Sequence, residues 1–489
     1  MTVIKLKRAR NSLLNVSRLP SEVLGDIFSR NVTAGKVGRS RNFLFVCHHW
    51  FNVASCTPEV WSCWGDTPED WKKWCFRYPS APLDLILNGS PLEKTTLDNS
   101  LQNALRDSTT RGNVRSIHLV SGDSELLGSI ISLLTPNREE ILPSDTRSIL
   151  VLDESRDSPV DVSEFLTYNR FPKLQRLLLD GCIISSWDPV VTVSQTSNLT
   201  ALAFYFGVPS PVPSMFQIRS IIASNPTLQE LSLGLRATLE DIGADSSPLP
   251  LPNLRELELI GDSRSIFGLL SQLDHPRNLD KFIINGTVEG IPETAGPYLR
   301  HYLQHHGRSG GLGLQLLSTK KYIDFHVGNV GGIDFSAPEP EQMVKFVEIT
   351  LRLDPFHSED RLMRAGLDLI AHVPREEVLY LVVGGDPGTM GEVSAQLPNL
   401  RALRFEGSSL DLAFPVPTLD ENAGIYPSLH HVTLKRVSAI GGDWSPLMTF
   451  LRQRMDSGNR LDTLRVIGSD RTSPRLSTIG GLVREYKRD

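Results

Sequence analysis

The stretch LQELSLGLRATLEDIGADSSPLPLPNLRELELIG, residues 228–261, carries one short pattern at both of its ends. In each copy an apolar residue is followed by two variable residues, a second apolar residue, one variable residue and a third apolar residue. The copies are Leu228–Leu231–Leu233 and Leu254–Leu257–Leu259. The last two positions alternate as in a β-strand, so each copy predicts a short strand that is buried on one face.

The same pattern recurs through most of the chain after residue 111. Successive central copies begin 25, 29, 26 and 25 residues apart, a period typical of leucine-rich repeats. We therefore predict an α/β fold in which residues 111–489 form an irregular leucine-rich-repeat solenoid with a curved parallel sheet. The other copies are Val114–Ile117–Leu119, Leu174–Leu177–Leu179, Leu199–Leu202–Phe204, Leu279–Phe282–Ile284, Val378–Leu381–Val383, Leu400–Leu403–Phe405, Leu429–Val432–Leu434 and Leu461–Leu464–Val466.

Short phrases that contain proline introduce several copies: FPKL, NPTL, LPNL, HPRNL and YPSL. Proline ends a preceding helix and favours extended backbone, which prepares the chain to enter a strand. Helices are predicted between the strands at Met215–Ala223, Ile266–Leu273 and Leu447–Met455. Residues 296–375 contain the glycine clusters RSGGLGLQ and GNVGGIDF, and no repeat can be assigned there.

Ahead of the repeats, residues 18–62 carry two apolar stripes at helical spacing. Pro20 suits the first turn of the first helix, because its missing N–H would be unpaired there in any case. The helices are apolar on more than one side, and about forty residues cannot bury all of that surface, so we expect part of it to contact a partner. The stripes consist of Val23, Leu24, Ile27 and Phe28, then Phe43, Val46, Cys47, Trp50, Val53 and Ala54.

Two further segments flank this module. Residues 1–17 form a basic tail that we predict to be disordered. Residues 63–110 are predicted to be a helical linker, with a helix that begins near Thr67 and places Trp71, Trp74 and Tyr78 on one packing face.

The segment RLPSEVLGDIFSRNV…NFLFVCHHWFNVAS resembles the F-box, and TPEVWSCW and SAPLDLIL resemble the phrases that follow it in the fungal (mushroom-type) F-box family. The resemblance implies that residues 18–62 dock on the Skp adaptor of a cullin–RING ubiquitin ligase, with Trp50 as an anchor. The alternative is that these residues pack against the chain's own Trp61–Trp74 segment. The implied adaptor-binding residues are Leu19, Pro20, Val23, Leu24, Ile27, Phe28, Val46, Cys47, Trp50 and Val53.

The same resemblance implies that the repeats hold a protein substrate for ubiquitination. A scaffold with leucine-rich repeats and no link to ubiquitin is the alternative. Residues between the apolar positions of each strand should face the concave side, acidic at the centre and mostly basic towards the C-terminus. The alternative is a solvated face with no selected charge. The candidate substrate-binding residues are Glu230, Glu256, Glu258, Lys281, Arg404, His431 and Lys435.

No constellation of residues predicts catalysis, a cofactor or a metal site. The histidine pairs at 48–49, 305–306 and 430–431 lack the one-turn spacing of metal ligands, and the cysteines form no C-x-x-C pair. We expect no enzyme activity; a hydrolase in the glycine-rich middle is the remaining catalytic alternative. A net charge of −6 gives no broad basic field for nucleic acid. Without a secretory signal or an apolar run near twenty residues, we expect a cytoplasmic or nuclear protein that does not enter membranes.

Overall fold

The structure is a computed structural model that divides the chain into two compact units, Met1–Leu231 (unit 1) and Ser232–Asp489 (unit 2). The boundary falls within strand β7, Glu230–Leu235. The structure describes residues 19–33, 46–57, 60, 63–64, 83–89, 113–135, 145–155, 158–168, 171–205, 211–235, 248–274, 279–287, 299–300, 303, 312–318, 322–329, 344–352, 369–384, 397–407, 426–437, 444–468, 479 and 481–488.

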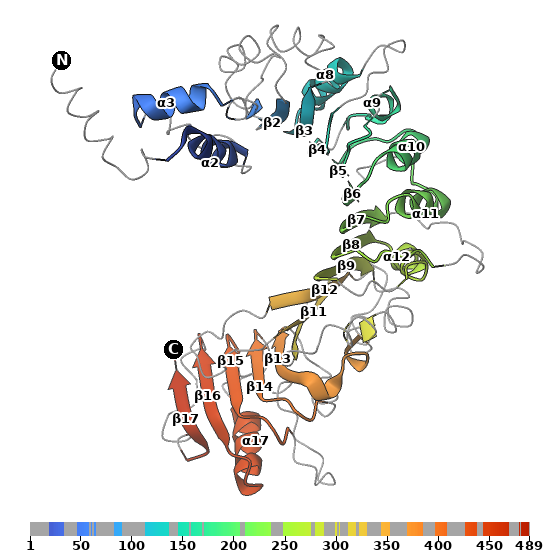
Figure 1. Cartoon of the computed structure of the whole chain (residues 1–489). Helices are drawn as coiled ribbons and strands as arrows, with labels where there is room; N and C mark the ends of the chain where they lie inside the picture. Colours follow the sequence, from blue (N-terminus) through green and yellow to red (C-terminus); the bar gives the residue numbers. More distant parts are fainter. Residues whose placement is uncertain are drawn as a thin grey trace, which may run out of the picture. The chain divides into compact units, whose positions relative to one another are not determined.

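Unit 1 contains a parallel sheet whose strands β1 to β6 pair in chain order. The helices that follow β3 onwards lie in a row along one face of this sheet (Figure 1). The strands are β1 Cys63–Trp64, β2 Leu83–Gly89, β3 Val114–Ser121, β4 Ser148–Asp153, β5 Arg176–Asp180 and β6 Ala201–Tyr205. The helices of the row are α8 Ser124–Leu134, α9 Ser163–Tyr168, α10 Asp188–Thr196 and α11 Met215–Ala223.

Unit 2 also contains a sheet, but its strands do not follow chain order throughout. The order is β8-β9-β12-β11-β10-β13-β14-β15-β16-β17. The strands are β8 Glu256–Gly261, β9 Lys281–Thr287, β10 Leu312–Ser318, β11 Tyr322–Asn329, β12 Val344–Arg352, β13 Val378–Gly384, β14 Ala402–Glu406, β15 His431–Lys435, β16 Leu461–Ile467 and β17 Val483–Arg488. Helices α12 Ser263–Leu270 and α17 Ser445–Asp456 and the 3-10 turn η3 Arg375–Glu377 lie between strands.

The expectation that all strands after residue 111 run parallel is wrong at one strand. β12 pairs parallel with β9, and β10 pairs parallel with β13, but β11 between them is antiparallel to both of its neighbours. Residues 312–352 thus insert three strands into an otherwise parallel sheet. The coarser prediction, a mixed α/β protein with parallel strands, is confirmed.

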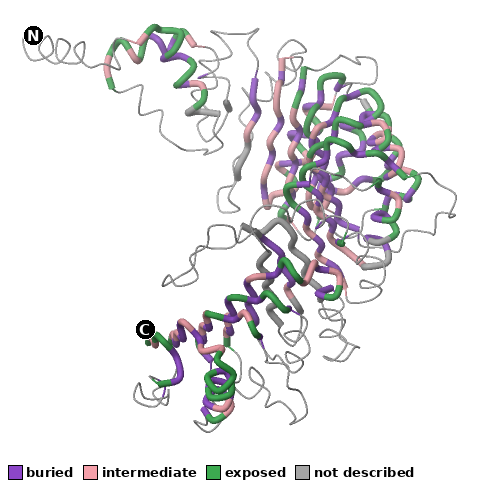
Figure 2. The backbone as a smooth tube through the Cα atoms, turned by 60° about the horizontal axis from the view of Figure 1, so that its bottom comes forward, coloured by how far each residue is buried: buried purple, intermediate pink, exposed green. Residues whose placement is uncertain are grey.

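The repeated apolar pattern places its strands correctly. The second and third residues of each copy lie in a strand and are buried, including Leu231 and Leu257. Figure 2 shows buried and intermediate residues alternating along strands of the sheet. Helix α11 has the predicted bounds, and α12 and α17 overlap the predicted helices. The strands form because alternate apolar side chains are removed from water while the polar ones between them stay accessible.

The proline phrases are turns that lead into the strands. In NPTL the N–H of Leu228 donates to the carbonyl of Asn225 at 3.1 Å, and the same bond joins Leu174 to Phe171 at 3.1 Å. Proline at the second position has its φ preset for such a turn. The buried side chain of Asn225 also accepts a hydrogen bond from the N–H of Leu199. The turn therefore fixes where each strand starts.

The predicted helical linker, residues 63–110, is wrong where the structure describes it. Strands β1 and β2 occupy described residues of that segment, and β2 pairs with β3. The helix expected near Thr67, with Trp71, Trp74 and Tyr78, lies outside the described residues, as does the basic tail 1–17. Among the helices that the structure describes, none has the length and apolar character needed to cross a membrane.

Candidate functional site

Two helices before the first strand form a small pair with its own core. They are α2 Ser21–Thr33 and α3 His48–Ser55. Leu24 and Phe28 of α2 are buried against Val53 and Ala54 of α3, and Val60 joins them. Leu19 and Trp50 are partly buried and pack against this cluster. The rings of Phe28 and Trp50 lie 5.1 Å apart between centroids and are tilted by 54°.

Helix α3 begins later than the apolar stripe suggests. Its N-cap is Cys47, whose sulfur accepts a hydrogen bond from the N–H of Trp50 at 3.5 Å. Val46 and Cys47 therefore precede the helix, and Phe43 lies outside the described residues. At the other end the Thr57 hydroxyl donates to the Val53 carbonyl at 2.8 Å. Thr57 also sits against Gly25 of α2, where an added Cβ would lie 2.9 Å from its Oγ1, so the pair is closely packed.

Four large apolar side chains of this module face outwards. Their exposed fractions are 43% for Val23, 44% for Ile27, 49% for Val46 and 46% for Phe51. Val23 and Ile27 are one turn apart and share a face of α2. A helix pair that already has a core and still exposes this much apolar surface is suited to contact another protein.

The ten residues implied by the resemblance thus separate into different environments. Leu24, Phe28 and Val53 are buried inside the pair, whereas Pro20, Val23, Ile27 and Val46 are exposed. Leu19, Cys47 and Trp50 are intermediate, so Trp50 holds the pair together more than it offers a free anchor. Phe51 is also exposed, although it is not among the residues that the F-box resemblance implies. Its position off the main apolar stripe is the signal in the sequence that marks it.

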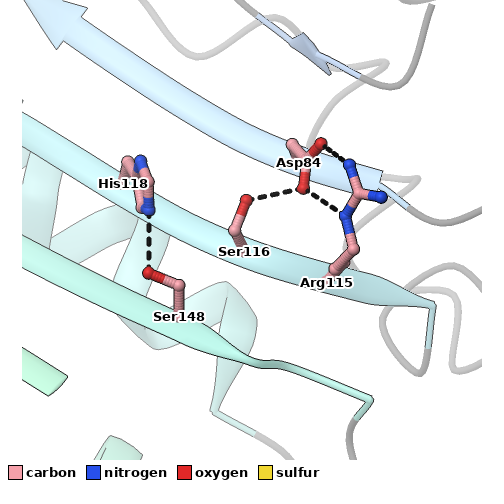
Figure 3. Close-up of polar contacts among 5 residues, drawn as sticks. All are labelled: Asp84, Arg115, Ser116, His118 and Ser148. Atoms are coloured by element: carbon pink, nitrogen blue, oxygen red, sulfur yellow. Dashed lines mark hydrogen bonds and ion pairs between the residues drawn. The ribbon is translucent and has the colours of Figure 1, made fainter. Parts of the chain in front are cut away.

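The face of the unit 1 sheet opposite the helices α8 to α11 carries a group of polar contacts (Figure 3). The largely buried carboxylate of Asp84 on β2 forms a bidentate ion pair with Arg115 and accepts a hydrogen bond from the Ser116 hydroxyl at 2.6 Å. Nearby, Nε2 of His118 and Oγ of Ser148 are 3.0 Å apart. The last two residues come from the neighbouring strands β3 and β4.

A serine hydroxyl bonded to a histidine is also half of an acyl-transfer triad. In a triad a carboxylate orients the imidazole. Here the Asp84 carboxylate is engaged by Arg115 and Ser116. The contacts therefore favour a polar network that ties β2, β3 and β4 together over a catalytic centre.

His118 makes this part of the sheet sensitive to pH. Burial lowers its pKa from 6.5, an effect opposed by Asp84 and reinforced by Arg176. The unfolded chain therefore binds a proton on His118 at a higher pH than the folded protein does. The free energy of unfolding accordingly falls as the pH drops below about 6.5. We expect the loss of thermal stability between pH 7.5 and pH 5 to be smaller in His118→Gln, which keeps a donor for Ser148.

The matched control for that measurement is His49→Gln, because His49 is exposed on α3. Thermal unfolding midpoints of the three proteins at both pH values make the comparison. If the unfolding midpoint of His118→Gln fell as much as that of the wild type, His118 would not be the source of the pH dependence.

The three glutamates proposed as an acidic patch each have a balancing neighbour. Glu230 forms an exposed ion pair with Arg176 at 2.9 Å. Glu258 accepts a hydrogen bond from the Ser232 hydroxyl at 3.1 Å, and Glu256 lies opposite Lys281 in the β8–β9 register. Glu230 belongs to unit 1 and the other two to unit 2. One of the three carboxylates is therefore paired with a cation, the second accepts a hydroxyl hydrogen bond, and the third has a lysine opposite it on the neighbouring strand.

The basic candidates Arg404, His431 and Lys435 are brought together on β14 and β15. His431 is in register with Ala402, and Lys435 is in register with Glu406. Glu406 forms an ion pair with Arg404 and lies 3.7 Å from the Lys435 amine. One carboxylate is thus shared by two cations.

Comparison with models of known protein families finds no match to this chain, and comparison with curated proteins finds no relative. Within the described residues, no group of three or more histidine, cysteine, aspartate or glutamate side chains is placed to hold a metal ion.

Proposed function

We propose that this protein is the substrate-recognition subunit of an SCF-type cullin–RING ubiquitin ligase. In this proposal the α2–α3 pair is an F-box that binds the Skp adaptor, and the strands of both units belong to an irregular leucine-rich-repeat solenoid that binds a protein substrate. The chain contributes binding surfaces, and the chemistry of ubiquitin transfer belongs to its partners.

The observation that carries the proposal is the outward apolar surface of the helix pair. Val23, Ile27 and Phe51 are exposed although Leu24, Phe28 and Val53 already form a core. Helix pairs of this kind bind partners by burying such side chains in a helix-on-helix interface. The F-box resemblance in residues 18–62 names the adaptor as that partner.

The sheet face opposite the helices supports the second half of the proposal. Helices α8 to α11 cover one side of the sheet in unit 1 (Figure 1), and the other side presents polar side chains such as Arg176 and Glu230. A surface built from many strands suits an extended protein segment.

The direct test is binding of the purified full-length chain to the purified Skp adaptor, measured by calorimetry and by co-elution on size exclusion. We expect a stoichiometric complex with a Kd in the micromolar range or tighter, and capture of the cullin when it is added. A chain that is folded but does not bind the adaptor would favour the alternative of a repeat scaffold unconnected to ubiquitin.

A further inference from the structure

The last strands of unit 2 align cationic side chains in one row across the sheet. In the register of β14, β15, β16 and β17, Arg404 is opposite Thr433, Thr433 is opposite Arg465, and Arg465 is opposite Lys487. The four residues therefore share one face. Adjacent strands lie about 4.8 Å apart, so the Cα atoms of Arg404 and Arg465 are about 9.6 Å apart with a threonine hydroxyl between them.

This face lies opposite the side that carries the core. Leu464 and Val466 of β16 are buried, and α17, which contacts β16, buries Leu447 and Leu451. Arg465 lies between Leu464 and Val466 in the strand, so its side chain points to the other side, where it is partly accessible.

The charges on this face do not cancel. Among the described residues that β14–β17 present there, the cations are Arg404, Lys435, Arg465 and Lys487, and the carboxylates are Glu406 and Glu485. Glu406 is shared by Arg404 and Lys435, and Glu485 lies 3.1 Å from the Lys487 amine. At the edge of the same strands Asp462 is bound by His430 and Arg484, each at 2.9 Å. Among the described residues of this face, the cations therefore outnumber the carboxylates by four to two.

Arg404 is also held in place before any partner arrives. The buried Tyr380 on β13 makes a side-chain hydrogen bond with it, and Glu406 on its own strand forms an ion pair with it. A guanidinium fixed on two sides loses little further freedom when it binds a carboxylate, which favours a charge-assisted contact.

We propose that the basic row, defined as Arg404, Arg465 and Lys487, together with Lys435 on the same face, binds an acidic segment of a protein partner. Calling that partner the substrate rests on the proposed function. A polyproline II segment, common in unfolded chains, rises about 3.1 Å per residue with three residues per turn. Acidic residues three positions apart therefore share one side at a separation of about 9.3 Å, which matches the spacing of Arg404 and Arg465.

The experiment is fluorescence anisotropy with the full-length chain and labelled peptides. One peptide carries two glutamates three positions apart, a second has the same composition with the glutamates adjacent, and a third carries phosphoserines in place of the glutamates. The variant is Arg465→Gln with Lys487→Gln. The control is Arg452→Gln, which removes an exposed cation from α17. We expect the spaced peptide to bind the double variant about three- to tenfold more weakly and the control unchanged.

Salt provides a readout that does not depend on a variant folding. Binding of the spaced peptide to the wild type should weaken strongly between about 0.05 and 0.5 M salt, where screening becomes short-ranged. If the phosphoserine peptide bound more tightly than the spaced glutamate peptide, the acidic groups of the partner would be phosphates. The proposal would be overturned by an affinity that does not depend on salt or on the glutamate spacing. It would also be overturned if the double variant bound the peptide as tightly as the wild type, or if the wild type bound a nucleic acid of equal charge more tightly.

Adaptor binding by the same preparations separates this proposal from the proposed function. A double variant that retains the adaptor but loses the peptide supports both. A wild type that binds the peptide without binding the adaptor supports the basic row and contradicts the ligase assignment.

Discussion

Replacing Ile27 and Phe51 together with aspartate should abolish binding of the Skp adaptor while the chain stays folded. Both side chains are about half exposed, so the unbound protein loses little packing when they change. In an interface, however, each substitution removes apolar contacts and buries an unpaired charge. A hot-spot residue of an interface contributes about 2 kcal/mol or more, so we expect the two substitutions together to lower the affinity by more than about 100-fold. Calorimetry with the purified adaptor measures the change.

The matched control is Phe216→Asp, because Phe216 is 78% exposed on α11, outside the helix pair. Leu24→Ala gives the contrasting result. Leu24 is fully buried, so its truncation should destabilise the α2–α3 pair by about 2–5 kcal/mol and expose its amides to hydrogen exchange. Unchanged adaptor affinity in the double aspartate variant would rule out this surface as the adaptor site.

Gly261→Ala should destabilise unit 2 severely. Gly261 ends β8 with φ at 151°, and an added Cβ would lie 1.6 Å from the carbonyl oxygen of Leu235. The next residue, Asp262, donates its N–H to that same oxygen at 2.9 Å and caps the start of α12 through Ser265. Relieving the clash therefore displaces both the strand end and the helix start. We expect a loss of about 3 kcal/mol or more in the free energy of unfolding.

Gly407→Ala is the control for this prediction. Gly407 follows β14 with φ at 65°, but an added Cβ would meet nothing within 4 Å. Only the backbone conformation disfavours alanine there, at a cost of about 1 kcal/mol. Urea unfolding followed by circular dichroism compares the two variants. Similar midpoints for both would show that β8 can shift away from Leu235 without loss.

Strands could be predicted from sequence where all three positions of the repeat are apolar and the copy follows the regular spacing; β12, with Val344, Val347 and Ile349, satisfies only the first condition. β4 was missed because Thr146 stands at the first position, before Ile149 and Val151. In the structure Thr146 is fully buried, and its hydroxyl donates to the carbonyl of Val114 at 2.8 Å. A hydrogen bond thus satisfies the polar group in an apolar position, and a pattern that counts only apolar residues cannot detect it.

The three strands of residues 312–352 escaped prediction for a different reason. Their sequences LGLQLLS, YIDFHVGN and VKFVEITLR alternate as strands do, but glycine clusters lie beside them and they do not continue the spacing of the repeats. Nothing local records the direction in which a strand will run. Pairing of β12 with β9 joins residues such as Val347 and Phe282, which are far apart in the chain. The direction of each of these strands is therefore determined by pairing between residues that are distant in the sequence.

The helix pair shows where sequence leaves a choice open. Val23, Leu24, Ile27 and Phe28 are all apolar and all suited to a helix–helix contact. Only packing against α3 decides that Leu24 and Phe28 turn inwards and that Val23 and Ile27 stay outside. The sequence could therefore predict an apolar helical segment but not which of its side chains stay exposed.

The inserted strands also bear on how quickly unit 2 can fold. Two pairings in the sheet of unit 2 skip strands along the chain: β10 pairs with β13, and β9, which ends at Thr287, pairs with β12, which begins at Val344. Closing a loop of that length costs conformational entropy before the ladder can form. The antiparallel neighbours β10, β11 and β12 assemble more locally, and their block must then meet β9 on one side and β13 on the other. We therefore expect chain closure between β9 and β12 to limit the refolding rate of unit 2.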